Sequence, residues 1–518
     1  MSLKLAAFGA IASLIWGVVL VIYRLYFHRL AKYPGPRLAA ITDWYASIFA
    51  WRGDLHVQSR KWHDKYGDIV RYGPNSLAFN TPAGLKDIYS TRSNVVKSAG
   101  YNSLSASRRT PNILNTTDKI VHGFKRRVLT QVFSFEGIKA IEARFLANVR
   151  DFIDLLGENE DTSSPDDGWS STKLVSELCD WLAFDIISDL CYGKDFDMLH
   201  SSEMRWFPSV VRKISQRGAT NMAQPSFCGL KIDRLFMASK FKDIVNAGTW
   251  VRERAEARTA LGNNIELKDA FYNMMNTADP KTGQYFTQKD LWVESMLLLT
   301  AVSNSWCQLG SDTTSSAMSG TLFYLVHNPK VLARLVHEIR TTFTAEEEIH
   351  MGRQLNSCEF LQACINESMR LVPSVANMIP RTVLKGGMTI DQEFVPEGTT
   401  VGTYVYSLQR SPKYFTAPNE WRPERWILDV QAGVDEESIK AAKAAFCPFS
   451  VGPRSCVGWK LAWTELNVTL ARMLFRYDVR LAPDAPCCGG KRSDCPYPLK
   501  GWVTSAVDGP YAQFRPRT

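Results

Sequence analysis

The stretch FCPFSVGPRSCVGWKLA, residues 446–462, decides the fold of this chain. Cys456 lies just before a segment with helical periodicity, and its flanking glycines let backbone approach a flat ligand closely. A helix N-terminus lowers the pKa of a nearby thiol and stabilises the thiolate. A cysteine taken alone is more often a small buried side chain, so the full spacing Phe-x-x-Gly-x-Arg-x-Cys-x-Gly is what indicates a ligand site.

This pattern resembles the haem-binding signature of the cytochrome P450 family at every defining position. The resemblance extends from YPGP at 33–36 to about residue 480. It implies haem b (iron protoporphyrin IX) as the cofactor and Cys456 as the axial ligand of its iron, since a thiolate ligand favours cleavage of the O–O bond. It also implies cofactor-binding roles for Phe449, Arg454 and, within MIPRTV, Arg381.

A pair of charges in NESMRL resembles the Glu-x-x-Arg of the same family. Glu367 and Arg370 are three residues apart and share a helix face, an arrangement that by itself is usually a surface ion pair of little energy. Arg425, in NEWRPERW at 419–426, follows at the usual distance for a buried triad with that pair. The expected role is structural, because a buried hydrogen-bonded network is costly to break.

The segment DKIVHGFKRRVLTQVFS, at 118–134, resembles the family's helix over one haem edge. The usual Trp-x-x-x-Arg of that helix is present here as His122 and Arg126. Four residues apart, the two side chains share a helix face and could both reach a haem propionate. His122 taken alone would be an exposed helix residue, and the departure from tryptophan distinguishes this chain from the usual pattern.

The segment GSDTTSSA, at 310–317, resembles the family's oxygen-activating helix. The resemblance assigns Asp312 and Thr313 a catalytic role in relaying protons to bound dioxygen. The residues VSNSWCQL at 302–309 separate this motif from the preceding apolar run and look like an insertion. Three interpretations stay open: a bulge or loop, spurious sequence from the gene model, or an altered active site.

The composition limits the remaining classes of protein. The chain has 518 residues, a net charge of +9 and eleven cysteines at irregular spacings, which favours reduced thiols over a disulfide framework. Its basic residues are scattered, so no nucleic-acid partner is expected. No linker follows the first forty residues, and we therefore predict a membrane anchor at 1–30 and one catalytic domain at 31–518.

Residues 5–23, LAAFGAIASLIWGVVLVIY, carry no charge. As a helix they would span ~28 Å, about the thickness of a bilayer core. A cleaved signal peptide is the alternative, but the run is long and lacks a clear cleavage site. The positive charges follow the run, which predicts a single-pass protein of the endoplasmic reticulum membrane with its catalytic domain in the cytosol.

The remaining pattern predicts a mainly α-helical fold with small β-sheets, the cytochrome P450 fold, preceded by one transmembrane helix. A hairpin is expected at 68–80, because β-branched and aromatic residues flank a Gly-Pro turn. Residues 118–375 are mostly helical in period, short strands are expected at about 380–405, and 458–477 is helical again.

Segments such as YGDIVRYGPNSLAFNT resemble filamentous-fungal members of secondary metabolism, of the trichothecene hydroxylase type. The resemblance implies a monooxygenase that uses dioxygen to oxidise an apolar terpenoid or polyketide. Electrons would come from NADPH-cytochrome P450 reductase, docking on a basic face near Lys125 and Arg127.

Two alternatives remain. A haem-thiolate isomerase or dehydratase would turn over without a reductase, although it has less need of the Asp312–Thr313 pair. A haem-binding sensor, or an inactive product caused by the insertion at 302–309, is the second. No output domain supports a sensor.

Overall fold

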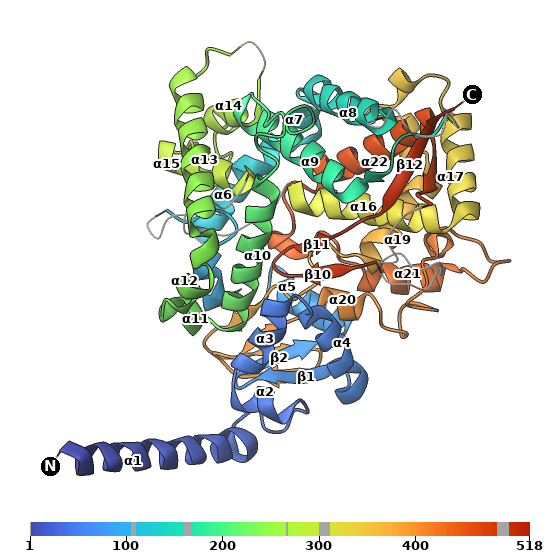
Figure 1. Ribbon diagram of the computed structural model, residues 1–518. Coiled ribbons are helices and arrows are strands. Elements are labelled where there is room, and N and C mark those ends of the chain that lie inside the picture. The colour runs from blue at the N-terminus through green and yellow to red at the C-terminus, as the bar shows by residue number, and fades with distance from the viewer. Residues whose placement is uncertain are drawn as a thin grey trace.

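Helices dominate the fold. The computed structural model describes residues 2–104, 110–159, 168–265, 268–299, 311–483 and 497–517. Within these ranges the strands form only small sheets (Figure 1), so the expected fold class is confirmed. The longer helices are α1 (Ser2–Ile22), α3 (Trp44–Arg52), α4 (Leu55–Tyr66), α5 (Pro82–Tyr89), α6 (Lys119–Val132), α8 (Glu142–Gly157), α9 (Val175–Tyr192), α10 (Phe207–Ala223), α13 (Phe241–Leu261), α15 (Gln288–Leu299), α16 (Ser311–His327), α17 (Pro329–Thr342), α19 (Glu359–Leu371), α21 (Glu436–Ala445) and α22 (Trp459–Arg476). The short ones are α2 (Arg37–Ile41), α7 (Phe135–Lys139), α11 (Ser226–Gly229), α12 (Ile232–Phe236), α14 (Ala270–Asn276), α18 (Arg353–Asn356) and α20 (Val405–Leu408).

The largest sheet joins strands from both halves of the chain. Its order is β1-β2-β8-β5-β3, with bounds Ile69–Gly73, Ser76–Phe79, Thr400–Gly402, Arg381–Val383 and Val95–Lys97. β1 and β2 form the hairpin predicted for 68–80, and β5 and β8 lie in the region where short strands were expected. β3 pairs with β5 in a register that sets Lys97 opposite Arg381. Two cations distant in sequence therefore meet at one edge of the sheet.

Three smaller sheets are present among the described residues. One has the order β4-β12-β9 (Lys173–Leu174, Tyr511–Pro516, Tyr477–Leu481), and the others pair β6 with β7 (Met388–Ile390, Glu393–Val395) and β10 with β11 (Leu499–Gly501, Ser505–Val507). Residues 502–504, the turn between β10 and β11, line the main cavity described below.

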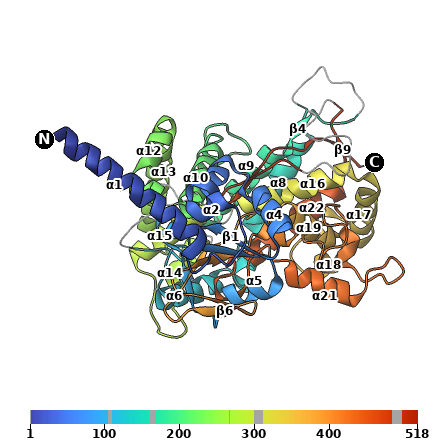
Figure 2. The same ribbon diagram turned by 90° about the horizontal axis from the view of Figure 1, so that it is seen from below.

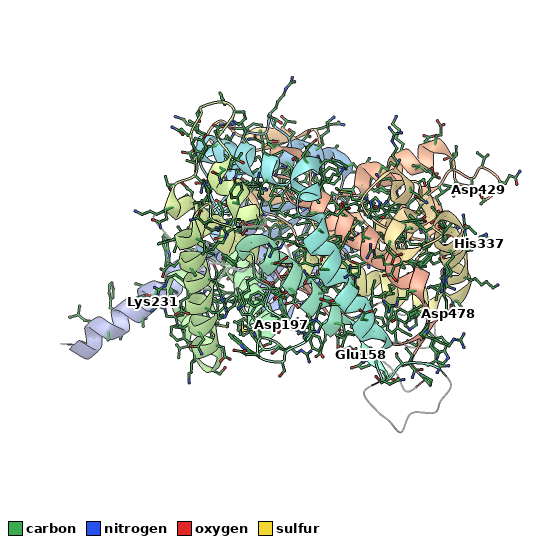
Figure 3. The ribbon with its side chains drawn as sticks, turned by 90° about the horizontal axis from the view of Figure 1, so that it is seen from above. Glu158, Asp197, Lys231, His337, Asp429 and Asp478 are labelled. Carbon is green, nitrogen blue, oxygen red and sulfur yellow. The ribbon has the colours of Figure 1, made fainter. Side chains whose placement is uncertain are left out.

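Helix α16 forms the centre of the core. It is buried on nearly every side, as expected of a helix without a polar face, and it packs against α9, α19 and α22 in the middle of the molecule (Figures 1 and 2). Its small residues permit this close packing, since a Cβ on Gly320 would lie 3.2 Å from the Cβ of Val372. Exposed charges of both signs lie at the periphery, where Glu158, Lys231 and Asp429 are labelled in Figure 3.

An apolar helix precedes this body. Residues Lys4–Phe27 form a helical segment of 24 residues, none of it buried, that projects away from the rest of the chain (Figure 1). At ~1.5 Å per residue the segment is about 36 Å long, enough to cross a hydrocarbon core of about 30 Å. It contains the predicted run at 5–23. At its base, the Arg71 guanidinium donates to the Arg24 carbonyl at 2.8 Å and fixes the start of the globular part.

Candidate functional site

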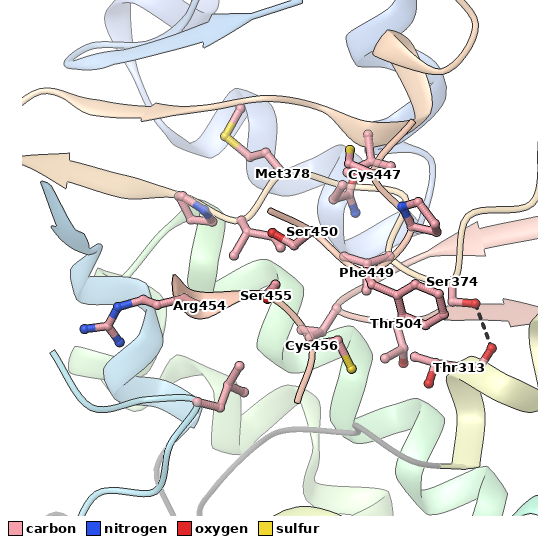
Figure 4. A pocket seen from close by; sticks show the side chains of 18 of the residues that line it. Thr313, Ser374, Met378, Cys447, Phe449, Ser450, Arg454, Ser455, Cys456 and Thr504 are labelled. Atoms are coloured by element: carbon pink, nitrogen blue, oxygen red, sulfur yellow. Dashed lines mark hydrogen bonds between the residues drawn. The ribbon is translucent and has the colours of Figure 1, made fainter. Parts of the chain in front are cut away.

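A cavity of about 220 Å³ lies beside Cys456 (Figure 4). Its walls come from segments far apart in sequence: β3, α6, α10, α16, β5, the loop before α22 and the β10–β11 turn. Most of the lining is apolar, and it includes Phe449 next to the cysteine loop. A mainly apolar cavity with few polar groups is typical of a site for a cofactor and a small molecule.

The cysteine loop has a fixed backbone. The Cys456 N–H donates to the Phe449 carbonyl at 2.8 Å, which closes the loop. Gly452 has φ +77°, and a Cβ there would lie 2.0 Å from the Tyr89 carbonyl oxygen. This glycine therefore allows close packing against the Tyr89 backbone, and not the close approach of a ligand that the sequence predicted. At Gly458 a Cβ would meet no atom of the described chain within 4 Å, which leaves open space beside the cysteine.

The Cys456 thiol differs electrostatically from the sequence expectation. Burial raises its pKa, and the Gly458 N–H and the Arg126 charge offset this only in part. The lowered pKa predicted from the helix N-terminus is therefore wrong for the protein alone, because burial of the thiol outweighs the Gly458 N–H at the start of α22. Binding of a metal ion deprotonates a coordinating thiol outright, so a ligand role does not need the lowered pKa.

The predicted arginines meet at the cavity. Arg126 donates to the carbonyl and, at 3.3 Å, to the hydroxyl of Ser455, the residue before the cysteine. Arg454 donates to the Thr116 carbonyl at 2.9 Å, and Arg381 donates to the Tyr101 hydroxyl at 3.2 Å. All three arginines line the cavity, and the structure thus brings together residues from α6, β5 and the cysteine loop.

Lys97 is a further cavity residue that the sequence reasoning missed. It is buried, and its ammonium group donates to the carbonyls of Leu114 and, at 3.0 Å, of Ile113. A single lysine in a short strand carries no pattern of its own. Only its pairing with Arg381 across β3 and β5 could have identified it.

His122 lies among these cations. Burial lowers its pKa to about 3, and the charges of Arg454, Lys97, Arg126 and Arg381 add to the effect. The imidazole is therefore neutral at physiological pH, and its N–H is available as a donor. The alternative of an exposed helix histidine does not hold, because His122 is buried in α6.

The residues present fit a haem group. Among the described residues that line the cavity, four are cationic and none is a carboxylate. Burying so much positive charge without counter-ions is unfavourable. Two propionate carboxylates would supply the missing negative charge, and the thiol of Cys456 supplies a soft ligand for iron.

The two predicted relay residues are placed differently. Thr313 lines the cavity, and its carbonyl accepts a hydrogen bond from the Ser374 hydroxyl at 2.7 Å (Figure 4). Asp312 is not among the described lining residues, and its buried carboxyl faces Asp180, Arg212 and Thr504 instead. The predicted insertion at 302–309 and Gly310 lie outside the described residues.

The charges predicted to form a triad do meet. The Glu367 carboxylate accepts two hydrogen bonds from Arg370, each of 2.9 Å, and one from Arg425 of 2.8 Å. Burial alone would raise the pKa of Glu367, but the two arginines outweigh it and hold the pKa below its ordinary value. The group lies away from the cavity wall, which fits a structural role.

The predicted reductase-docking face is wrong at Lys125. Its side chain is 2% exposed and donates to Asp290 at 2.7 Å and to Glu294 at 2.9 Å, both on α15. Arg127 is paired with Asp279. Packing of α6 against α15 thus buries Lys125, whereas Arg127 stays 34% exposed in its pair with Asp279.

The chain matches the family model described as Cytochrome P450 over residues 37–488. It is 36% identical to the cytochrome P450 monooxygenase atnE of Emericella nidulans, over 99% of this chain and 98% of that protein. It is 35% identical to the monooxygenase AKT7 of Alternaria alternata, over 98% and 97%.

Matches of lower identity point to the same family. The Trichothecene C-15 hydroxylase of Fusarium sporotrichioides is 29% identical, over 92% of this chain and 93% of that protein. The haem domain of cytochrome P450DA has the same fold, with a TM-score of 0.68 at 18% identity over 90% and 93% of the two chains. This chain therefore belongs to the cytochrome P450 family, and the expected enzyme class, a cytochrome P450 monooxygenase with a haem iron cofactor, is confirmed.

Proposed function

We propose that this chain is a membrane-bound monooxygenase that hydroxylates or otherwise oxidises an apolar terpenoid or polyketide in fungal secondary metabolism. The observation that carries the proposal is the mainly apolar cavity in which Cys456 lies beside a cluster of cations. The similarity to the Trichothecene C-15 hydroxylase supports the substrate class but does not extend to its substrate, because the residues that contact a substrate vary on a common scaffold.

In this proposal the cofactor is haem b, and Cys456 would bind its iron. The haem supplies the activation of dioxygen. Arg126, Arg381 and Arg454 hold its propionates, and neutral His122 donates a further hydrogen bond. Support comes from their common place on the cavity wall and from the lack of carboxylates among the described lining residues. Phe449, which lines the cavity and whose carbonyl closes the cysteine loop, contacts the cofactor.

Asp312 and Thr313 are proposed to move protons to the oxygen-binding side. Thr313 lines the cavity, and its turn of α16 is held by Ser374 and by Ser316, whose hydroxyls both donate to the Thr313 carbonyl. Asp312 is the acid that feeds this side. General acid catalysis of this kind contributes typically about 10²–10⁴-fold to a rate.

Residues 1–30 are proposed as a single-pass anchor in the endoplasmic reticulum membrane, with residues 31–518 as the cytosolic catalytic domain. The exposed apolar helix and the positive charges that follow it support this topology. NADPH-cytochrome P450 reductase donates the electrons. Protease added to sealed microsomes should degrade the catalytic domain, and protection of that domain would reverse the topology.

The proposed ligand is tested by a carbon monoxide difference spectrum of the reduced protein. Wild type should give the thiolate-type spectrum, and Cys456→Ser should abolish it. Cys447→Ser is the matched control, because Cys447 is a second free thiol that lines the same cavity. A Cys456→Ser protein that keeps the spectrum would end the assignment. Turnover of a substrate without NADPH would favour the isomerase or dehydratase alternative.

A further inference from the structure

The carboxyl of Asp312 has no direct place on the cavity wall. The first turn of α16 contributes Thr313 and Thr314 to the lining, whereas Asp312 points toward α9 and α10. A proton held on Asp312 therefore needs an intermediate group to reach the cavity. The Thr504 hydroxyl hydrogen-bonds the Asp312 carboxyl, and Thr504 also lines the cavity.

Thr504 is held rigidly in this bridging position. It lies in the turn between β10 and β11 and is 2% exposed. Its hydroxyl is 3.1 Å from the hydroxyl of Ser215 on α10, and its backbone N–H donates to the same Ser215 oxygen at 3.0 Å. Figure 4 shows Thr504 in the pocket with Thr313, Phe449 and Cys456. A hydroxyl fixed at both its side chain and its backbone is well oriented for proton transfer.

The surrounding charges keep a proton on the acid. Burial raises the pKa of Asp312, the Asp180 charge raises it further, and Arg212 and Thr504 lower it only in part. Burial also raises the pKa of Asp180, which pairs with Arg212 and accepts from Ser315 at 2.5 Å.

Asp312 therefore retains a proton near neutral pH. The Arg212 side chain is 32% exposed and interacts with the charges of Glu177 and Asp508. Arg212 therefore links the two carboxyls to solvent.

We propose that Thr504 is a proton-relay residue that passes protons from Asp312 to the oxygen-binding side of the cavity. In this relay the Thr504 hydroxyl gives its proton to the oxygen-binding side of the cavity. As that proton leaves, Thr504 takes the proton of Asp312, and solvent reprotonates the carboxylate on the side where Arg212 is partly exposed. Electrons come from the reductase, so no other reagent is needed. The inference rests on the proposed monooxygenase function.

The first test is infrared spectroscopy of the full chain with isotope-labelled aspartate. The Asp312 carboxylic acid band is identified by its loss in Asp312→Asn. In Thr504→Val the band should move to higher frequency because the hydrogen bond is lost, and in Thr504→Ser it should stay near the wild-type position. Ser374→Ala, which removes a cavity hydroxyl bonded to the Thr313 carbonyl, should leave the band unchanged. An unchanged band in Thr504→Val overturns the proposal.

The second test follows the fate of dioxygen in the reductase-coupled holoenzyme with NADPH alone. Forming two waters from dioxygen takes four protons and four electrons, whereas hydrogen peroxide takes two of each. Thr504→Val should slow water formation by about 10-fold or more and raise the peroxide share, while Thr504→Ser restores it. Equal partition in wild type and Thr504→Val refutes the relay. A missing thiolate-type spectrum in wild type would instead refute the proposed function.

Discussion

Replacing Glu367 with glutamine tests the energy of the buried triad. The side chain is fully buried and accepts five hydrogen bonds, from Arg370 (two), Arg425, the Arg422 N–H and the Trp426 indole, all between 2.8 and 3.0 Å. The amide keeps the shape but leaves Arg370 without its counter-ion. Removing one partner of such a pair costs about 3–5 kcal/mol.

The expected shift in melting temperature is small because the chain is long. At about 2.1 cal/mol/K per residue, 518 residues give an unfolding entropy of about 1.1 kcal/mol/K, so the midpoint should fall by about 3–5 °C. Circular dichroism on heating measures it. Glu424→Gln is the control, because Glu424 forms only an exposed 3.5 Å pair with Arg334 and should shift the midpoint by less than about 1 °C. Equal shifts in the two variants would refute the reasoning.

The same variant has a defined pH dependence. Because the folded state lowers the pKa of Glu367 below its ordinary value of 4.5, the carboxylate stabilises the fold above that value and loses its effect as pH falls through the lowered pKa. The stability difference between wild type and Glu367→Gln should therefore be largest at neutral pH and shrink on acidification. A difference that grows as pH falls would contradict this sign.

Three further outcomes follow from the structure. Lys97→Met should speed the transfer of haem to an excess of haem-free globin, because the cavity loses one cation and two carbonyls lose their donor. The control Lys500→Met, at an exposed lysine, should leave the rate of haem transfer unchanged. Deleting 302–309 should preserve haem incorporation, measured by the carbon monoxide spectrum, because hydrogen bonds from distant segments hold the start of α16. A deletion variant that fails to fold, while the full-length protein is active, would contradict this prediction. Removing residues 5–23 should move the protein from the membrane to the soluble fraction with its spectrum intact, and continued sedimentation with membranes would count against the anchor.

The local motifs were predictable because their chemistry depends on short spacings. Cys456 and its loop follow from one continuous stretch. The Glu367–Arg370 pair follows from the three-residue period of one helix, and the β1–β2 hairpin from its turn residues. The apolar run at 5–23 needs only length and composition.

Packing between segments far apart in the chain decided the surroundings of the other site residues. Lys125 looked like a surface charge until α15 placed Asp290 and Glu294 against it. Asp312 and Thr313 are adjacent in sequence, yet only Thr313 lines the cavity. The Asp312 carboxyl interacts instead with charged groups on α9 and α10.

The sequence by itself determined the family and the helical class, and it predicted the thiol ligand and the anchor, because each rests on residues close together in the chain. Only the tertiary structure decided which charges face the cavity. Lys97 reaches it through the β3–β5 pairing, and the contact of Thr504 with Ser215 on α10 holds Thr504 there; both contacts join segments hundreds of residues apart. Burial and charge at one point in space depend on every element that converges there, and no local spacing records that convergence.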